Sequence, residues 1–268
     1  MSGTRHPNFC GIAVMAKASL PGRAKTRLSP PLTLEEATAC NTAFLRDIGD
    51  NLLAAAKLAP ISGAMAYGPP GQGHFFKRHM PPGIGQFEVW EPEFGHCLIK
   101  ALEAQFAAGH HAGCVLNSDS PTLPPAILAD AAHRLAQPGD RLVLGPSADG
   151  GYYLLGCKTI HRRLFEDIAW STDIVARQTL ERAAEIGVEV QLLPEWYDVD
   201  NAASLRTLIG ELLDDRPFQP RLQSSPATHS AALLRRMRDE VDLDCRLTLG
   251  REPMAVNAAM PRLSGAGR

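Results

Sequence analysis

The sequence predicts an α/β protein built on a mostly parallel β-sheet. Apolar runs of about five residues, the length of a buried strand, alternate along the chain with longer segments of helical length. That alternation is typical of a layered α/β architecture, in which helices cover the faces of one sheet. The composition agrees, because 45% hydrophobic and 21% charged residues over 268 positions are ordinary for a globular chain.

Seven segments have the length and apolar character of strands. They are residues 11–15, 61–67, 86–90, 113–117, 141–144, 152–156 and 188–193. Five segments have the length and one-sided apolar pattern of helices. They are residues 33–57, 95–108, 124–135, 172–186 and 202–213. Thr33 and Glu36 form a capping-box pattern at the first helix, Pro124 and Pro125 suit a first helical turn, and Ser171 is the expected cap of the fourth.

The chain changes character after residue 213, where prolines and serines become frequent. We therefore assign residues 1–215 to one domain and residues 216–268 to a C-terminal appendage. Only one short basic helix, residues 231–241, is expected in the appendage, and the rest is expected to be partly disordered, as terminal segments of such composition often are.

The overall charge excludes several classes of partner. The chain has 27 Lys and Arg against 29 Asp and Glu, a net charge of -2, so it has no global attraction for nucleic acid. Its apolar runs are far shorter than the roughly 20 residues of a membrane span, so no membrane insertion is expected. The first residues lack the apolar core of a signal peptide, which predicts a cytoplasmic protein.

Six scattered cysteines without a C-x-x-C pair are interpreted as buried free thiols, and the nine histidines lack zinc-ligand spacing.

A basic loop follows the first predicted strand. The first 34 residues contain no carboxylate and five basic side chains: Arg5, Lys17, Arg23, Lys25 and Arg27. Four of the five belong to the loop A-K-A-S-L-P-G-R-A-K-T-R-L, which leaves the carboxyl end of the strand, where open α/β sheets bind ligands. Gly22 permits close backbone approach, and Lys25, Thr26 and Arg27 supply donors. The loop matches neither a P-loop nor a dinucleotide fingerprint. A solvated loop is the alternative, and phosphate binding is favoured.

Acidic residues follow two later segments. Asp119 ends a predicted strand in V-L-N-S-D-S-P, where it could hold a hard cation or instead cap the turn before Pro121. Further on, W-Y-D-V-D-N contains Asp198 and Asp200, which we expect to point to opposite sides of an extended segment, so that only one shares a metal with Asp119. Asp200 is the preferred partner, with helix capping as its alternative role. Together with the basic loop, this pattern predicts a divalent cation bridging nucleotide phosphates.

Two further motifs are candidates for an acceptor or sugar pocket. In P-S-A-D-G-G-Y-Y, Gly150 and Gly151 could admit a ligand, although a tight hairpin explains them better, and Asp149 could act as a hydroxyl acceptor or base. Trp170, Ser171 and Thr172 could offer hydroxyls or amides to an anion, but anchoring and capping explain them without a ligand.

These motifs, in this order, resemble a known family. The chain is similar to the small GT-A-type glycosyltransferase-like proteins described as radical-SAM or selenodomain-associated transferases and linked to arsenosugar biosynthesis. The resemblance is collinear over about residues 10–210 and rests on the basic loop, N-S-D-S-P-T-L-P, L-G-P-S-A-D-G-G-Y-Y-L-L-G, I-A-W-S-T and L-P-E-W-Y-D-V-D. It implies a three-layer GT-A fold within the nucleotide-diphospho-sugar transferase superfamily, which also includes nucleotidyltransferases.

The resemblance also implies roles for particular residues. Lys17, Lys25 and Arg27 would face the nucleotide phosphates, Asp119 and Asp200 would hold Mg²⁺ or Mn²⁺, and Asp149 would face the sugar or acceptor. The nucleotide side would also include Ala16, Gly22, Thr26, Asn117 and Ser118. One departure is clear: the family usually has a D-L-G-E-R-M-like segment before the fourth strand, whereas this chain reads E-F-G-H-C-L-I-K. That departure leaves the donor and the acceptor open.

The expected activity is transfer of a glycosyl group from a nucleotide sugar to a small-molecule acceptor. Lys25 and the cation would stabilise the departing diphosphate, and Asp149 would be the acceptor's base. One alternative is a nucleotidyltransferase, which would use a nucleoside triphosphate and a phosphorylated small molecule. Another is a non-catalytic nucleotide-binding protein that docks a partner through its basic C-terminal helix.

Overall fold

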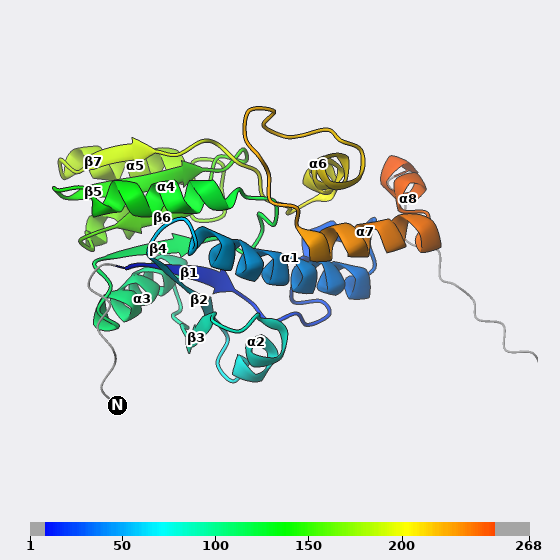
Figure 1. Ribbon diagram of the computed structural model, residues 1–268, viewed down its shortest axis with the longest axis horizontal. Helices are drawn as coiled ribbons and strands as arrows, with labels where there is room; N and C mark the ends of the chain where they lie inside the picture. Colours follow the sequence, from blue (N-terminus) through cyan, green and yellow to red (C-terminus); the bar gives the residue numbers. More distant parts are fainter. Residues whose placement is uncertain (1–8, 250–268) are drawn as a thin grey trace, which may run out of the picture.

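A single mixed sheet organises the protein. The computed structural model describes residues 9–249 and contains a seven-stranded sheet in the order β3-β2-β1-β4-β6-β5-β7 (Figure 1). The strands are β1 Cys10–Ala16, β2 Ile61–Tyr67, β3 Gly85–Glu88, β4 Ala112–Leu116, β5 Arg141–Pro146, β6 Tyr152–Cys157 and β7 Glu189–Leu192. Only β6 runs antiparallel to its neighbours, β4 and β5. The predicted mostly parallel sheet is therefore confirmed, with each strand boundary within a residue or two.

Helices cover both faces of the sheet. They are α1 Leu34–Ala55, α2 Gly73–His79, α3 Phe94–Ala107, α4 Pro125–Ala136, α5 Val175–Glu185, α6 Ala202–Leu213, α7 Thr228–Val241 and α8 Leu243–Leu249, with short 3-10 turns η1 Thr26–Leu28 and η2 Arg162–Phe165. Alternate residues of β1 enter two different cores: Ile12 and Val14 pack with α1 and α4, whereas Ala13 packs with α3. The result is the expected three-layer sandwich.

The sequence pattern predicted the start of α1 correctly but not the cap of α5. The capping box at α1 is confirmed, since Thr33 Oγ1 accepts from Glu36 N at 3.1 Å and Thr33 N donates to Glu36 Oε2 at 2.8 Å. Ser171, however, does not cap α5: it has φ +66° and lies in a turn before the helix, whose N-cap is Ile174. The backbone turns once more between Ser171 and the helix, so the capping prediction was wrong.

The segment after α6 packs onto the main core. Helix α7 lies along α1 (Figure 1). The side chains of Leu234, Met237, Leu243 and Leu247 are buried in the same core as the sheet. In its described part, residues 214–249, this stretch holds two helices where one was expected. The proposed boundary at residue 215 stays a prediction. Arg5 and residues 250–268 lie outside the described residues.

Within residues 9–249, no helix combines the length and the hydropathy that crossing a bilayer requires. All six cysteines are free and five of them are buried, Cys10, Cys114 and Cys157 among them, as the sequence predicted.

Candidate active site

Lys25 and two aspartates form the centre of the candidate site. The Lys25 Nζ lies 2.7 Å from Asp119 Oδ1 and 2.9 Å from Asp200 Oδ1, and it donates to the carbonyl of Val199 at 2.8 Å. All three ammonium donors are therefore used, and the Lys25 side chain is only 5% exposed. The Lys25 Nζ also lies 5.6 Å from the centroid of the Phe44 ring of α1. The two acids that the sequence paired do converge.

The topology of the sheet brings these residues together. Lys25 lies in the loop after β1, and Asp119 lies just after β4, the strand that pairs with β1 on the side away from β2. The crevice between two strands whose connections leave in opposite directions is where open α/β sheets bind ligands. Asp200 arrives from the segment before α6, and Val199 N donates to the carbonyl of Asp119 at 2.8 Å. That backbone bond fixes the two acidic segments side by side.

Local backbone geometry points each group inward. Lys25 has φ +53°, an unusual left-handed conformation for a residue with a side chain, and it starts the η1 turn. Asn201, not Asp200, caps α6, since its side chain accepts from Ala203 N and Ser204 N. Because Asn201 performs the capping, the Asp200 carboxylate is free to face Lys25.

The oppositely charged side chains of the site stabilise one another in their ionised forms. Burial alone would lower the pKa of Lys25, but Asp119 and Asp200 outweigh burial and raise it, so the ammonium stays charged. Burial alone would raise the pKa of Asp200, but Lys25 and Arg27 outweigh burial and lower it. Arg27 forms an ion pair with Asp200 while its side chain remains 72% exposed. It can therefore reach an incoming anion from the solvent side.

Asp198 belongs to the same acidic region, contrary to the sequence expectation. Burial, together with the nearby charges of Asp149, Asp200 and Asp119, raises the pKa of Asp198 to about 7. Residues two apart in extended backbone share a side, so Asp198 and Asp200 lie on one side while Val199, fully buried, lies between them on the other. The assignment to opposite sides was wrong because it misapplied the period of the strand.

A buried polar network holds the acidic segment in place, and sequence reasoning missed it. The Trp196 indole N–H donates to Thr122 Oγ1 at 3.3 Å, Thr122 Oγ1 donates to the Tyr197 hydroxyl at 3.0 Å, and that hydroxyl donates to Glu211 Oε2 at 2.6 Å. Trp196 is fully buried. The signal available in the sequence was the W-Y pair directly before the acids, because large aromatic residues with polar tips are strong anchors when buried.

The β5–β6 hairpin carries Asp149 to the edge of the acidic region. Its turn is a true hairpin, as expected for Gly150 and Gly151, and Asp149 Oδ1 accepts from Gly151 N at 2.9 Å. Gly150 has φ +91°, and a Cβ there would lie 2.0 Å from the carbonyl oxygen of Asp173. The turn thus packs directly on the segment before α5. Asp149 is exposed and close enough to Asp198 to affect its charge.

The other predicted residues divide into two groups. Asn117 and Ser118 support Asp119: Ser118 Oγ donates to Asp119 Oδ1 at 2.9 Å, and Asp119 N donates to Asn117 Oδ1 at 3.4 Å. The remaining residues do not contact the central acids in any interaction recorded for the described part of the chain. Of these, Lys17, Gly22 and Thr26 are exposed on the loop, Ala16 is buried at the end of β1, and Trp170, Ser171 and Thr172 lie in the turn before α5.

The donor set of the central site suits a divalent cation. Carboxylate oxygens are the ligands that Mg²⁺ and Mn²⁺ prefer. The four carboxyl groups of Asp119, Asp149, Asp198 and Asp200 outnumber the cationic side chains of Lys25 and Arg27, and burial together with the neighbouring acids raises the pKa of Asp198. A cation shared by Asp119 Oδ1 and Asp200 Oδ1 would compete for both oxygens with Lys25 Nζ. Its binding would therefore require the ammonium to leave that position.

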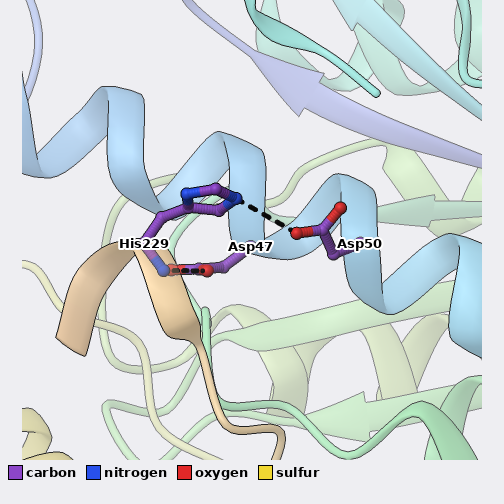
Figure 2. Close-up of side chains that lie close together, drawn as sticks. All are labelled: Asp47, Asp50 and His229. Atoms are coloured by element: carbon purple, nitrogen blue, oxygen red, sulfur yellow. Dashed lines mark hydrogen bonds and ion pairs between the residues drawn. The ribbon is translucent and has the colours of Figure 1, made fainter. Parts of the chain in front are cut away.

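A second group with possible ligand atoms lies between α1 and α7. One oxygen or nitrogen from each of Asp47, Asp50 and His229 lies within 4.8 Å of the other two, a spacing that could hold a metal ion. Figure 2 shows that the His229 ring faces Asp50, at 3.2 Å, and that its backbone N–H faces Asp47. The Asp47 carboxylate already accepts from the backbone N–H groups of His229 and Ser230 and from the Ser230 hydroxyl. It therefore caps α7 from a neighbouring helix.

Comparisons with known proteins place the fold. A family described as "Uncharacterized protein conserved in bacteria (DUF2064)" matches residues 51–172, which include Asp119 and Asp149 but neither the basic loop nor Asp200. Among curated proteins, none matches the sequence. A solved structure from Desulfovibrio desulfuricans G20, assigned to the nucleotide-diphospho-sugar transferases, aligns over 90% of this chain and 97% of its own with a TM-score of 0.74 and 25% identity.

Two more distant structures have TM-scores below 0.5, and we draw no argument from them. A CMP:2-keto-3-deoxy-manno-octonic acid synthetase complexed with CTP aligns over 77% of this chain and 99% of its own, with a TM-score of 0.48 and 12% identity. A glucosyl-3-phosphoglycerate synthase from Mycobacterium tuberculosis, in complex with Mn²⁺, UDP and glucosyl-3-phosphoglycerate, aligns over 76% and 77%, with a TM-score of 0.46 and 10% identity. The chain has an α/β fold of the nucleotide-diphospho-sugar transferase type.

Proposed function

We propose that this protein is a divalent-cation-dependent transferase that moves a glycosyl group from a nucleotide sugar to a small-molecule acceptor. The observation that carries the proposal is the convergence of Asp119, Asp200 and Lys25 in the crevice between β1 and β4. The similarity of 90% of the chain to a protein assigned to the nucleotide-diphospho-sugar transferases supports it. The narrower resemblance to selenodomain-associated transferases stays a prediction.

Each group would have a separate task. Asp119 and Asp200 would hold Mg²⁺ or Mn²⁺, which when bound supplies charge neutralisation to the diphosphate. Lys25 and Arg27 would donate hydrogen bonds to the phosphate oxygens as negative charge develops on the leaving group. Lys25 is held charged by its surroundings, so it can perform this task across the neutral pH range.

Asp149 is the proposed base for the acceptor hydroxyl. It is exposed at the tip of the hairpin, beside the acidic region but outside the Lys25 ion pairs, so its carboxylate can receive a proton from a bound hydroxyl. Gly150 lets this tip pack against Asp173, and the turn of residues 170–173 would form the other wall of the acceptor pocket.

The same phosphate-facing groups would also serve a nucleoside triphosphate, and the product separates the two reactions. We would incubate the protein with Mg²⁺ or Mn²⁺ and panels of nucleotide sugars or triphosphates, each with candidate acceptors. Release of nucleoside diphosphate supports glycosyl transfer, whereas release of pyrophosphate supports nucleotidyl transfer instead. Cation-dependent nucleotide binding without turnover of any donor would support a binding protein.

Substitution of the acids tests the assigned residues. Asp119→Asn and Asp200→Asn should each reduce turnover on the order of a hundredfold, the usual cost of one group that stabilises transition-state charge. The matched control is Asp130→Asn on α4, because Asp130 forms only a half-exposed ion pair with Arg134. If both site variants retain the activity of the control, the assignment of the cation site is wrong.

A further inference from the structure

Arg246 of α8 binds the far end of the basic loop. Its guanidinium donates to the carbonyl of Pro31 through Nε at 3.1 Å and Nη2 at 2.6 Å, and to Glu36 Oε1 through Nη1 at 2.9 Å. The Arg246 and Glu36 side chains are only 14% and 19% exposed. Several charge-assisted bonds from one planar group at a part-buried position fix both distance and orientation.

The two groups that Arg246 holds define the junction between the loop and α1. Pro31 follows the η1 turn, which begins directly after Lys25, and Glu36 is the capping-box partner of Thr33. Leu28 and Leu32 on either side of Pro31 are fully buried, so the chain between η1 and α1 has little freedom once Pro31 is fixed. The position of Lys25 therefore depends on anchors at Pro31 and Glu36, six and eleven residues further along the chain.

Helix α8 also contacts α6, the helix that follows the second acid. Arg206 of α6 donates to the carbonyl of Leu247 in α8, and α6 starts directly after Asp200 and its neighbour Asn201. α6 in turn packs against η1. Thus α8 contacts both the loop that presents Lys25 and Arg27 and the helix that follows Asp200.

The α7 helix holds α8 in this place. Asp47 of α1 caps α7, and His229 pairs with Asp50, as Figure 2 shows. Leu234 and Met237 of α7 and Leu243 of α8 are buried against the core. These contacts hold α8 beside the junction between the basic loop and α1.

We infer that Arg246 is a positioning residue for the basic loop: through Pro31 and Glu36 it fixes the loop from which Lys25 and Arg27 meet Asp119 and Asp200. Arg246 itself bonds to none of these four side chains in any recorded interaction of residues 9–249. Its effect on the reaction rests on the proposed function, whereas its effect on the loop does not.

Hydrogen exchange of the full-length protein tests the effect on the loop. We would compare wild type, Arg246→Ala, Arg246→Lys and the control Arg235→Ala, an exposed arginine on α7. Arg246→Ala should raise the exchange rate of amides in residues 22–36 by about tenfold, the cost of one hydrogen bond to a charged group, with β5 and β7 unchanged. Arg246→Lys should give an intermediate rate, because an ammonium lacks the planar fork, and Arg235→Ala should match wild type.

Nucleotide binding tests the effect on the site. With Mn²⁺ present, titration of UDP and GDP should show a dissociation constant raised about tenfold in Arg246→Ala, again the cost of one charged hydrogen bond. Should Arg246→Ala fail to fold, Glu36→Gln removes the same charge pair from the other side while leaving an oxygen for Thr33 N. Unchanged exchange in residues 22–36 in these variants overturns the inference. Faster exchange with unchanged affinity also overturns it, since the contact would then be structural only. If wild type binds no nucleotide, the proposed function fails, and the exchange data still decide whether Arg246 holds the loop.

Discussion

Lys25 is the residue on which the site depends most directly. It is almost wholly buried and is the shared partner of two carboxylates that come from distant parts of the chain. The sequence predicted the residues that meet, because each follows a strand or precedes a helix at one edge of the sheet. It could not predict that Lys25 bonds the acids themselves, since the η1 turn and the left-handed backbone of Lys25 depend on packing against α1 and α6.

Removal of the Lys25 charge should destabilise the fold and increase the stabilisation that a bound cation provides. Lys25→Met leaves two part-buried carboxylates facing each other, which should lower the free energy of unfolding by about 3 kcal/mol at neutral pH. Mn²⁺ should restore part of that loss in Lys25→Met and should stabilise wild type less, because in wild type the ion must displace an ammonium.

Urea unfolding with and without Mn²⁺ measures both effects. The matched control is Lys17→Met in the same loop, because the Lys17 side chain is exposed. If Lys25→Met is as stable as Lys17→Met, the ion pairs do not hold the two acidic segments together in solution.

Asp198 shows a limit of reasoning at this scale. The W-Y-D-V-D-N motif contains both acids. The choice of Asp200 over Asp198 relied on the expectation that their side chains point to opposite sides of the backbone, and they do not. Both acids lie in the same region, and they differ in charge balance rather than in direction. The cationic side chains of Lys25 and Arg27 lower the pKa of Asp200, whereas the charges that act on Asp198 are those of other aspartates. That difference depends on tertiary neighbours and is not visible in a local pattern.

At the scale of elements, long periodic segments were predictable and short ones were not. All seven strands and the helices α1, α3, α4, α5 and α6 follow from apolar pattern and length. α2 and α8 have seven residues each, too few for a period to be visible, and α2 forms because Phe76 is buried and stacks on Tyr67. The segment after α6 was expected to be a partly disordered appendage because of its polar composition, yet α7 packs on α1, and Leu243 and Leu247 of α8 are buried in the main core.

The attachment of α8 should depend on acid pH. Burial alone would raise the pKa of Glu36, but hydrogen bonds from Arg246 and Thr33 outweigh it, so the folded-state pKa lies below the ordinary value of 4.5. A carboxylate with a lowered pKa contributes stability that is fully present above its unfolded pKa and is lost as the pH falls through its folded pKa. The free energy of unfolding of wild type should therefore fall below about pH 4.5. Glu36→Gln lacks this contribution at every pH.

Urea unfolding between pH 6 and pH 3 provides the measurement. The difference in unfolding free energy between wild type and Glu36→Gln should shrink as the pH falls. If the difference in unfolding free energy stays constant over this range, the Glu36–Arg246 pair does not form. In that case Arg246 of α8 would not hold the basic loop through Glu36.

At the scale of the whole molecule, one sheet edge collects groups from three distant parts of the chain. The loop after β1, the loop after β4 and the segment before α6 meet there, and the hairpin between β5 and β6 adds Asp149 beside them. The alternation of strands and helices predicts the parallel part of this arrangement. The antiparallel placement of β6 between β4 and β5 does not follow from alternation, because pairing direction is set by the short hairpin and its forced glycine.

The most direct measurement of the central claim is the anomalous diffraction of Mn²⁺ in crystals grown with a nucleoside diphosphate. We expect a peak bound by the carboxylates of Asp119 and Asp200, with Lys25 Nζ moved from between them onto a phosphate oxygen. A peak confined to Asp47, Asp50 and His229, or Lys25 still bridging the two acids beside a bound nucleotide, would contradict the proposed site.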